Sequence, residues 1–175
     1  MAVDVRDAGP RDAAVIAAIH AQSWRDAYRG ILSDDYLAND VDAERLAMWT
    51  GRMAAWNPGR HFARIASVDG MPAGFACVLA DEEPEHGALL DNLHILPAHR
   101  AAGLGKSLLV DCGRWVARTF PGMPMHLTVF QVNERARAFY RRMGGVESAP
   151  FDGFERDGRF HRVVRVVWTD PRSIA

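Results

Sequence analysis

Residues 97–106 combine glycines with basic side chains, at a point where an apolar run gives way to a helical pattern. The first N–H groups of a helix have no partners inside it and carry partial positive charge, so they attract anions. Gly103 and Gly105 have no side chain that would keep an oxygen-bearing group away from the main chain. Arg100 and Lys106 add positive charge beside them. This combination predicts a site for a phosphate or a pyrophosphate.

Two common phosphate-binding patterns fail on specific residues of this stretch. A P-loop begins with a glycine six residues before its Lys, and Arg100 stands at that position, although Gly105-Lys106-Ser107 supplies the end of the motif. The dinucleotide fingerprint GxGxxG would place its third glycine at Leu108, and it follows the first strand of its fold, not a late one. A third interpretation, a tight turn before a helix without any ligand, stays open on this stretch alone.

A second pattern follows the next apolar run. Asn133, Ala136, Phe139, Tyr140 and Gly144 stand at the spacing NxxAxxFYxxxG. With the arginine–glycine stretch, this pattern resembles the GNAT superfamily of N-acetyltransferases, whose pyrophosphate loop reads Gln or Arg, two residues, Gly, one residue, then Gly or Ala. The family usually has an aromatic residue after the last glycine of the second motif, and this chain departs from that. The departure lies at a helix exit, where we expect little effect on chemistry.

Two further features extend the resemblance along the chain. The apolar run 89–96, stopped by Pro97, is similar to the central strand of the family. Ser23-Trp24-x-x-x-Tyr28 resembles the first helix of many bacterial members. The likeness therefore covers residues 3–168 in order, and it implies one acetyltransferase domain over residues 1–175.

The elements that must position these motifs follow from hydrophobic periodicity. We expect helices at 11–28, 41–55, 104–119 and 133–143, and strands at 3–6, 61–68, 73–80, 89–96 and 126–131, with two more between 146 and 168 joined near Asp157-Gly158. The strand–helix–strand order around 104–119 is a βαβ unit with parallel strands. The resemblance implies an α/β fold with a GNAT-type mixed, mostly antiparallel sheet of six to seven strands, a central splayed parallel pair and flanking helices.

The resemblance also implies a cofactor, coenzyme A carried as acetyl-CoA. Its pantetheine arm would bond to main-chain groups of Leu93, His94 and Ile95, and Asn133 would contact the pantetheine or the cofactor end of the last helix. The pyrophosphate would meet one continuous segment of the chain. That segment comprises Arg100, Ala101, Ala102, Gly103, Leu104, Gly105 and Lys106.

Acetyl transfer to a primary amine by direct attack in a ternary complex sets the catalytic demands. A lysine-like amine with pKa about 10.4 is neutral in roughly one molecule of a few thousand at pH 7, so a base must take its proton. Asp91, in an apolar strand, is either this base or the partner of an arginine. By the resemblance, Tyr140 gives a proton or a hydrogen bond to the leaving thiolate; its alternative is a core residue. Alternation places Asp91 and Leu93 on one face and turns His94 toward a helix.

The acceptor is a small-molecule amine or a peptide amine, and the sequence does not choose between them. Trp24 and Tyr28 are candidates for an aromatic wall of its site, although one of them belongs to the core in the simplest interpretation. Homodimers are common in the family. Two competing functions remain open: an inactive relative that senses acyl-CoA, and an NTP-dependent enzyme that uses Lys106 and Ser107.

Composition excludes several other classes. With a formal net charge of −1, no strong field draws the chain to nucleic acid or to an anionic membrane. Cys77 and Cys112 lack the spacing of a disulfide framework or a thiolate metal site, and we expect no metal. No secretory signal or membrane-spanning run is visible, so we expect a cytoplasmic protein. Neither HExxH nor GxSxG occurs.

Overall fold

One sheet of eight strands organises the chain in this computed structural model, which describes residues 2–154 and 157–174. The strands lie in the order β1-β2-β3-β4-β5-β8-β6, and β7 also pairs with β8. Within the described residues, β4 and β5 form the parallel pair and every other pairing is antiparallel. The strands are β1 (Val3–Asp7), β2 (His61–Val68), β3 (Met71–Leu79), β4 (Ala88–Ile95), β5 (Met125–Phe130), β6 (Val146–Glu147), β7 (Phe151–Phe154) and β8 (Phe160–Trp168).

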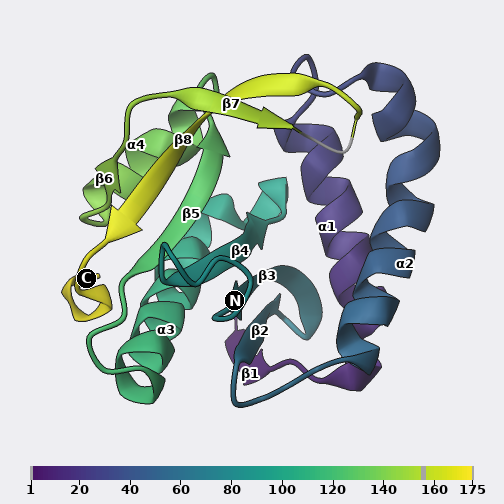
Figure 1. The fold of residues 1–175 in the computed structure, drawn as a ribbon. Coiled ribbons are helices and arrows are strands. Elements are labelled where there is room, and N and C mark those ends of the chain that lie inside the picture. Colours follow the sequence, from purple (N-terminus) through teal and green to yellow (C-terminus); the bar gives the residue numbers. More distant parts are fainter. Residues whose placement is uncertain (1, 155–156, 175) are drawn as a thin grey trace.

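Helices cover both faces of the sheet (Figure 1). On one face lie α1 (Ala13–Ala27) and α2 (Val41–Ala54), and on the other lie α3 (Leu104–Thr119) and α4 (Glu134–Arg142). Short helical segments are η1 (Pro10–Asp12), η2 (Tyr36–Asp40), η3 (Pro97–Ala102) and η4 (Pro171–Ser173). None of the described helices is both long and apolar enough to cross a membrane.

Each face of the sheet has its own core, because strand side chains alternate between the two faces. Leu108, Leu109 and Val116 of α3 are fully buried against β3, β4, β5 and β8. On the opposite face, Ile16 of α1 and Trp49 of α2 are fully buried against β2 and β3. Burial of apolar surface on both sides thus fixes the sheet between two helical layers.

Both cysteines are free and buried, as small core residues. Burial raises the pKa of the Cys77 and Cys112 thiols above the ordinary value, which keeps them protonated and unreactive. Across residues 2–154 and 157–174, no three His, Cys, Asp or Glu side chains gather as metal ligands.

The sequence-based elements match the observed ones closely, and the mixed sheet with its central parallel pair confirms the expected fold class. The β2–β3 hairpin turns at Asp69 and Gly70, whose φ values of 49° and 79° suit a tight two-residue turn. One expectation was wrong: the segment after residue 146 holds three strands, not two, so the sheet has eight strands and not six to seven. Pairing with β8 makes even the two-residue β6 a strand, and so short a strand has no periodicity to detect.

The parallel pair opens at its carboxyl end. β4 pairs with β5 only at Ala88↔Met125 and Leu89↔His126, and both strands continue beyond these pairs. Ligands of open α/β sheets bind outside the carboxyl ends of the strands, so this gap is the first place to look for a site.

Candidate active site

The middle of β4 contains a β-bulge. Asn92 pairs with Cys77 and Leu90 with Val78, so Asp91 is the extra residue between two registered neighbours. Leu90 and Leu93, three residues apart, consequently pack into the same core on the α3 face. The expectation that Asp91 shares a face with Leu93 was therefore wrong, because simple alternation does not continue through a bulge.

Asp91 faces α2 instead. Its Oδ2 accepts a hydrogen bond from Nη1 of Arg52 at 2.6 Å, and the amide of Asn92 donates to the same oxygen. The two partners of the ion pair are partly buried, at 28% and 16% exposed. The arginine partner that the sequence left open is thus Arg52, and the carboxylate still lines both cavities described below.

A groove of about 410 Å³ occupies the gap between β4 and β5. It runs from the start of α3 to Tyr140 on α4, and apolar side chains of β4 and α4 form much of its wall. Nine of the residues predicted to bind a cofactor line it. They are Leu93, His94, Ile95, Arg100, Gly103, Gly105, Lys106, Asn133 and Tyr140.

The main-chain groups of β4 divide between its two neighbours. Leu96 donates its N–H to the carbonyl of Ala73 at 2.8 Å. In an antiparallel pair alternate residues bond to the same neighbour, so His94 also directs its N–H and C=O to β3. Leu93 and Ile95 direct theirs into the opening toward β5. The geometry therefore favours Leu93 and Ile95 over His94 as main-chain partners for a ligand.

The segment before α3 forms the short helix η3 rather than an irregular loop, because Pro97 suits a first helical position. Ala102 and Leu104 turn their side chains into the core, and for Ala101 only the backbone is described. Gly103 occupies the N-cap position of α3 with a φ of 74°, and it has no side chain that could accept hydrogen bonds from the first amides of the helix. The first amides of α3 consequently stay uncapped at the end of the groove, which suits an anion.

Gly103 and Gly105 serve different purposes. A Cβ on Gly103 would meet no atom within 4 Å, but the positive φ strains any residue that has one. A Cβ on Gly105 would point at Phe139 and Ile95, at 3.6 and 3.7 Å, which is ordinary contact. Gly103 is therefore required by backbone conformation, and Gly105 is not.

Arg100 lies in η3, five residues after the end of β4. Its Nε donates to the carbonyl of Ile95 at 3.3 Å, and its Nη2 forms an ion pair with Asp26 of α1. Its charge is thus shared between the groove and α1. Lys106 of α3, and Arg135 and Arg142 of α4, also line the groove, and sequence reasoning missed the last two.

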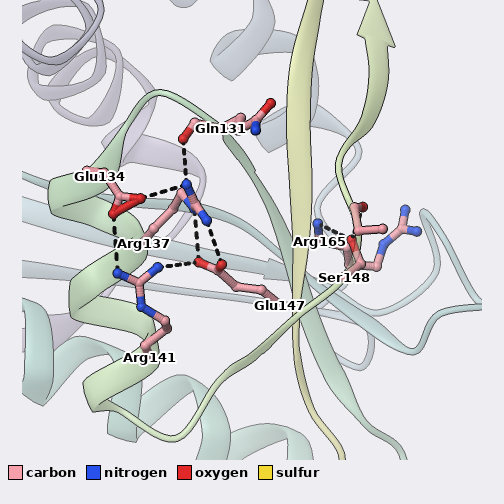
Figure 2. A network of polar contacts seen from close by, with 8 residues as sticks. Gln131, Glu134, Arg137, Arg141, Glu147, Ser148 and Arg165 are labelled. Atoms are coloured by element: carbon pink, nitrogen blue, oxygen red, sulfur yellow. Dashed lines mark hydrogen bonds and ion pairs between the residues drawn. The ribbon is translucent and has the colours of Figure 1, made fainter.

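An ion-pair network around Arg137 (Figure 2) and the side chain of Asn133 fix α4. The Asn133 Oδ1 accepts from the N–H of Ala136 at 3.2 Å and so caps the helix. Arg137 donates to both carboxylate oxygens of Glu147, at 3.0 and 2.7 Å, and to the carbonyl of Gln131 at 2.8 Å. These hydrogen bonds from Arg137 lower the pKa of Glu147. The network joins α4 to β5 and β6 and thereby orients the face that carries Tyr140.

Tyr140 is 9% exposed and lines the groove. Its ring packs edge-on against Trp168, with centroids 5.9 Å apart. No hydrogen bond of its hydroxyl is found within the described residues. Burial, with a smaller contribution from nearby Tyr28, raises the pKa of the phenol well above 10, so Tyr140 stays protonated. It is both a core residue and a proton holder facing the groove.

A second, more polar cavity of about 190 Å³ lies between α1, α2 and the sheet. Trp24 and Tyr28, the residues predicted to border the acceptor, both line it, and their rings lie 5.3 Å apart. Sequence reasoning missed Arg45 and Arg52, although their spacing of seven places both on one face of α2. It also missed Thr128, a polar residue inside the apolar run of β5.

The groove and the cavity meet. Four residues line both: Tyr28, Asp91, Thr128 and Val129. His94 lines the groove, and its ring lies 4.7 Å from that of His20, which lines the cavity, and 5.5 Å from that of Phe75. Burial, with the positive charges of Arg45 and Arg100, lowers the pKa of His94 to about 3, so it is neutral. Its side chain packs against a helix, as the sequence predicted.

Comparison with known proteins identifies the family of the chain. The sequence profile of the acetyltransferase (GNAT) family matches residues 21–145. The chain belongs to this family. A probable N-acetyltransferase of Mycobacterium tuberculosis is 26% identical over 140 residues, which cover 80% of this chain and 78% of that protein. The resemblance to the GNAT superfamily that the sequence indicated is thereby confirmed.

Solved structures share the fold. The PaiA N-acetyltransferase of Thermoplasma acidophilum, in complex with coenzyme A, superposes with a TM-score of 0.69 at 17% identity, covering 96% of this chain and all of that one. YncA of Salmonella typhimurium, with acetyl-CoA, gives 0.68 at 18% identity, covering 96% and 94%. At such identities the likeness concerns the fold.

Proposed function

We propose that the protein is an N-acetyltransferase that moves an acetyl group from acetyl-CoA to a primary amine, with both substrates bound together. The junction of groove and cavity at Tyr28, Asp91, Thr128 and Val129 carries this proposal. It offers one meeting place for two molecules that enter from different sides. Acetyl-CoA would supply an activated acyl group as a thioester, open to direct attack by the amine.

The residues of the groove fit coenzyme A. The uncapped amides at the start of α3 and the charge of Lys106 suit its diphosphate. The main-chain groups of Leu93 and Ile95 suit the amides of the pantetheine arm, except that Ile95 already gives its carbonyl to Arg100. Asn133 holds the α4 end of the same wall.

Two groups of the chain would handle protons. Asp91 lies at the junction, where its carboxylate can attract an ammonium and accept its proton. Tyr140, kept protonated by burial, can donate a hydrogen bond to a leaving thiolate. The thiol has a pKa of roughly 8.5, so hydrogen bonding from Tyr140 is easier than full proton transfer.

Binding and turnover test the proposal separately. Titration calorimetry with coenzyme A should show one site per chain, and acetyl-CoA should release thiol with at least one member of a panel of primary amines. Coenzyme A binding without thiol release on any amine would make the protein an acyl-CoA sensor. Tight ATP binding without coenzyme A binding would overturn the assignment of the groove.

A further inference from the structure

Arg45 is the least expected residue of the polar cavity. Its side chain is 2% exposed, and its guanidinium carbon lies 4.4 Å from the ring centre of Trp24. Nη2 donates to Glu44 at 2.7 Å. Its buried Nε has no hydrogen-bond partner among the described residues. A buried guanidinium therefore lines the cavity with part of its donor set unused.

Such a group is costly unless something binds to it. A guanidinium has five N–H donors, and a buried donor without an acceptor loses its hydrogen bonds to water without gaining new ones. The planar fork of N–H groups matches a carboxylate, which can accept two hydrogen bonds at once. Stacking on Trp24 holds the plane of Arg45 in place, so the fork is oriented before a ligand arrives.

The opposite charge lies elsewhere in the same cavity. The Asp91 carboxylate lines the junction with the groove, and Arg52 holds it at 2.6 Å. Arg45 precedes Arg52 by seven residues on α2, roughly 10 Å along the helix. The cavity thus presents a carboxylate paired with Arg52 where an amine must react, and a second arginine, Arg45, away from that point. Trp24, Phe130 and Met48 add apolar surface to the same cavity.

We propose that the acceptor is an amino acid, a small molecule with both a primary amine and a carboxylate, and that Arg45 binds the carboxylate. This inference rests on the proposed function, because that function makes the cavity the acceptor site. A polyamine, which carries only positive charge, would bring its second cation to Arg45 and is disfavoured.

Matched pairs of probes test the role of the carboxylate. L-leucine and L-leucinamide differ in that group alone, as do L-methionine and L-methioninamide, and 4-aminobutyrate and butylamine extend the comparison to a longer spacing. Each is titrated calorimetrically into the protein saturated with coenzyme A, and each is assayed for thiol release from acetyl-CoA. We expect the acid of at least one pair to bind and react at least tenfold better than its uncharged partner.

Variants locate the effect. Arg45→Lys keeps the charge but loses the fork, and Arg45→Met loses both; we expect the acid preference to fall partly in the first and to vanish in the second. Arg60→Met, an exposed arginine that lines neither cavity, is the control and keeps the preference. Melting temperature and coenzyme A affinity report whether each variant folds. If Arg45→Met does not fold, Arg45→Lys and the wild-type pairs decide.

The outcomes separate this inference from the proposed function. Equal or better binding and turnover of the amides and butylamine, or an acid preference that survives in Arg45→Met, overturns the inference and leaves the acetyltransferase intact. Tenfold tighter binding of an acid without any thiol release supports the carboxylate site and refutes the enzyme.

Discussion

The groove and the cavity share four lining residues, but they depend on different kinds of atoms. The groove depends on main-chain groups at the end of β4 and the start of α3, which strand register and the left-handed Gly103 put in place. The cavity depends on the ends of long side chains from α1 and α2, such as Trp24, Arg45 and Arg52. Main-chain geometry follows from short local motifs, whereas side-chain ends meet only when distant helices pack. The first half of the site is therefore specified locally, and the second by packing.

Gly103→Glu should have the largest effect of these substitutions, because it should weaken coenzyme A binding in the groove and leave the cavity intact. The substitution strains a backbone at φ of 74° and brings a carboxylate to the amides that await a phosphate. We expect the Kd for coenzyme A, measured by calorimetry, to rise about 100-fold or more, a change of roughly 3 kcal/mol. Gly105→Ala, whose methyl group makes ordinary contacts, should stay within about threefold of wild type. Unchanged affinity in Gly103→Glu would refute the assignment of the groove.

Tyr140→Phe should separate chemistry from binding within the groove. The phenyl ring keeps the contact with Trp168 and loses only the hydroxyl group. We expect kcat for thiol release to fall about 100-fold, the usual lower range for a lost proton donor, with little change in coenzyme A affinity. Since the pKa of Tyr140 lies above its ordinary value, the wild-type rate should show no loss from its ionisation below about pH 10. Weaker binding with unchanged turnover per bound complex would make Tyr140 purely structural.

Asp91→Asn and Arg52→Met together test the role of Asp91 at the junction of the groove and the cavity. If Asp91 is the base, Asp91→Asn lowers kcat/KM about tenfold or more and alters the pH–rate profile. Arg52→Met removes the partner at 2.6 Å but keeps the carboxylate, so the form of the profile should persist. Equal losses of melting temperature in both variants, with the profile unaltered, would reduce Asp91 to the partner of Arg52.

His94→Gln tests whether the buried His94 is neutral. Of the four sets of substitutions, we expect it to have the smallest effect at neutral pH. The folded pKa of about 3 lies below the ordinary 6.5, so acid favours the unfolded chain, which binds the proton. The stability that His94 contributes is thus complete above pH 6.5 and falls by at most about 1.4 kcal/mol for each pH unit below it. His94→Gln should lose stability less steeply than wild type between pH 6.5 and 5 in denaturant titrations. Parallel curves for the two proteins would show that His94 is not held neutral.

The sequence predicted the fold well because its signals are local and repeated. The helix 104–119 was predicted with its exact bounds, since capping glycine and apolar periodicity agree. The strand after residue 146 was misjudged because β6 exists only through its pairing with Val166 and Val167. The motif residues of the groove were found for the same reason as α3.

Only some of the residues of the cavity could be predicted from the sequence. Trp24 and Tyr28 were found because they stand in a recognisable helix, and Asp91 because a carboxylate in an apolar run is conspicuous. Arg45 and Arg52 were missed: nothing in a polar helical face indicates which arginine will be buried over a tryptophan. The bulge at Asp91 was also missed, since no glycine or proline marks it.

That bulge makes the length of β4 as important as its composition. A strand shorter by one residue at this point would keep nearly the same apolar character. Leu90 and Leu93 would then stand two residues apart and would still share the α3 face, so the pairing with β3 on either side would survive. What would disappear is the carboxylate at the junction of the groove and the cavity. A single inserted amino acid therefore places an acid in the central strand without changing the orientation of the residues on either side of it.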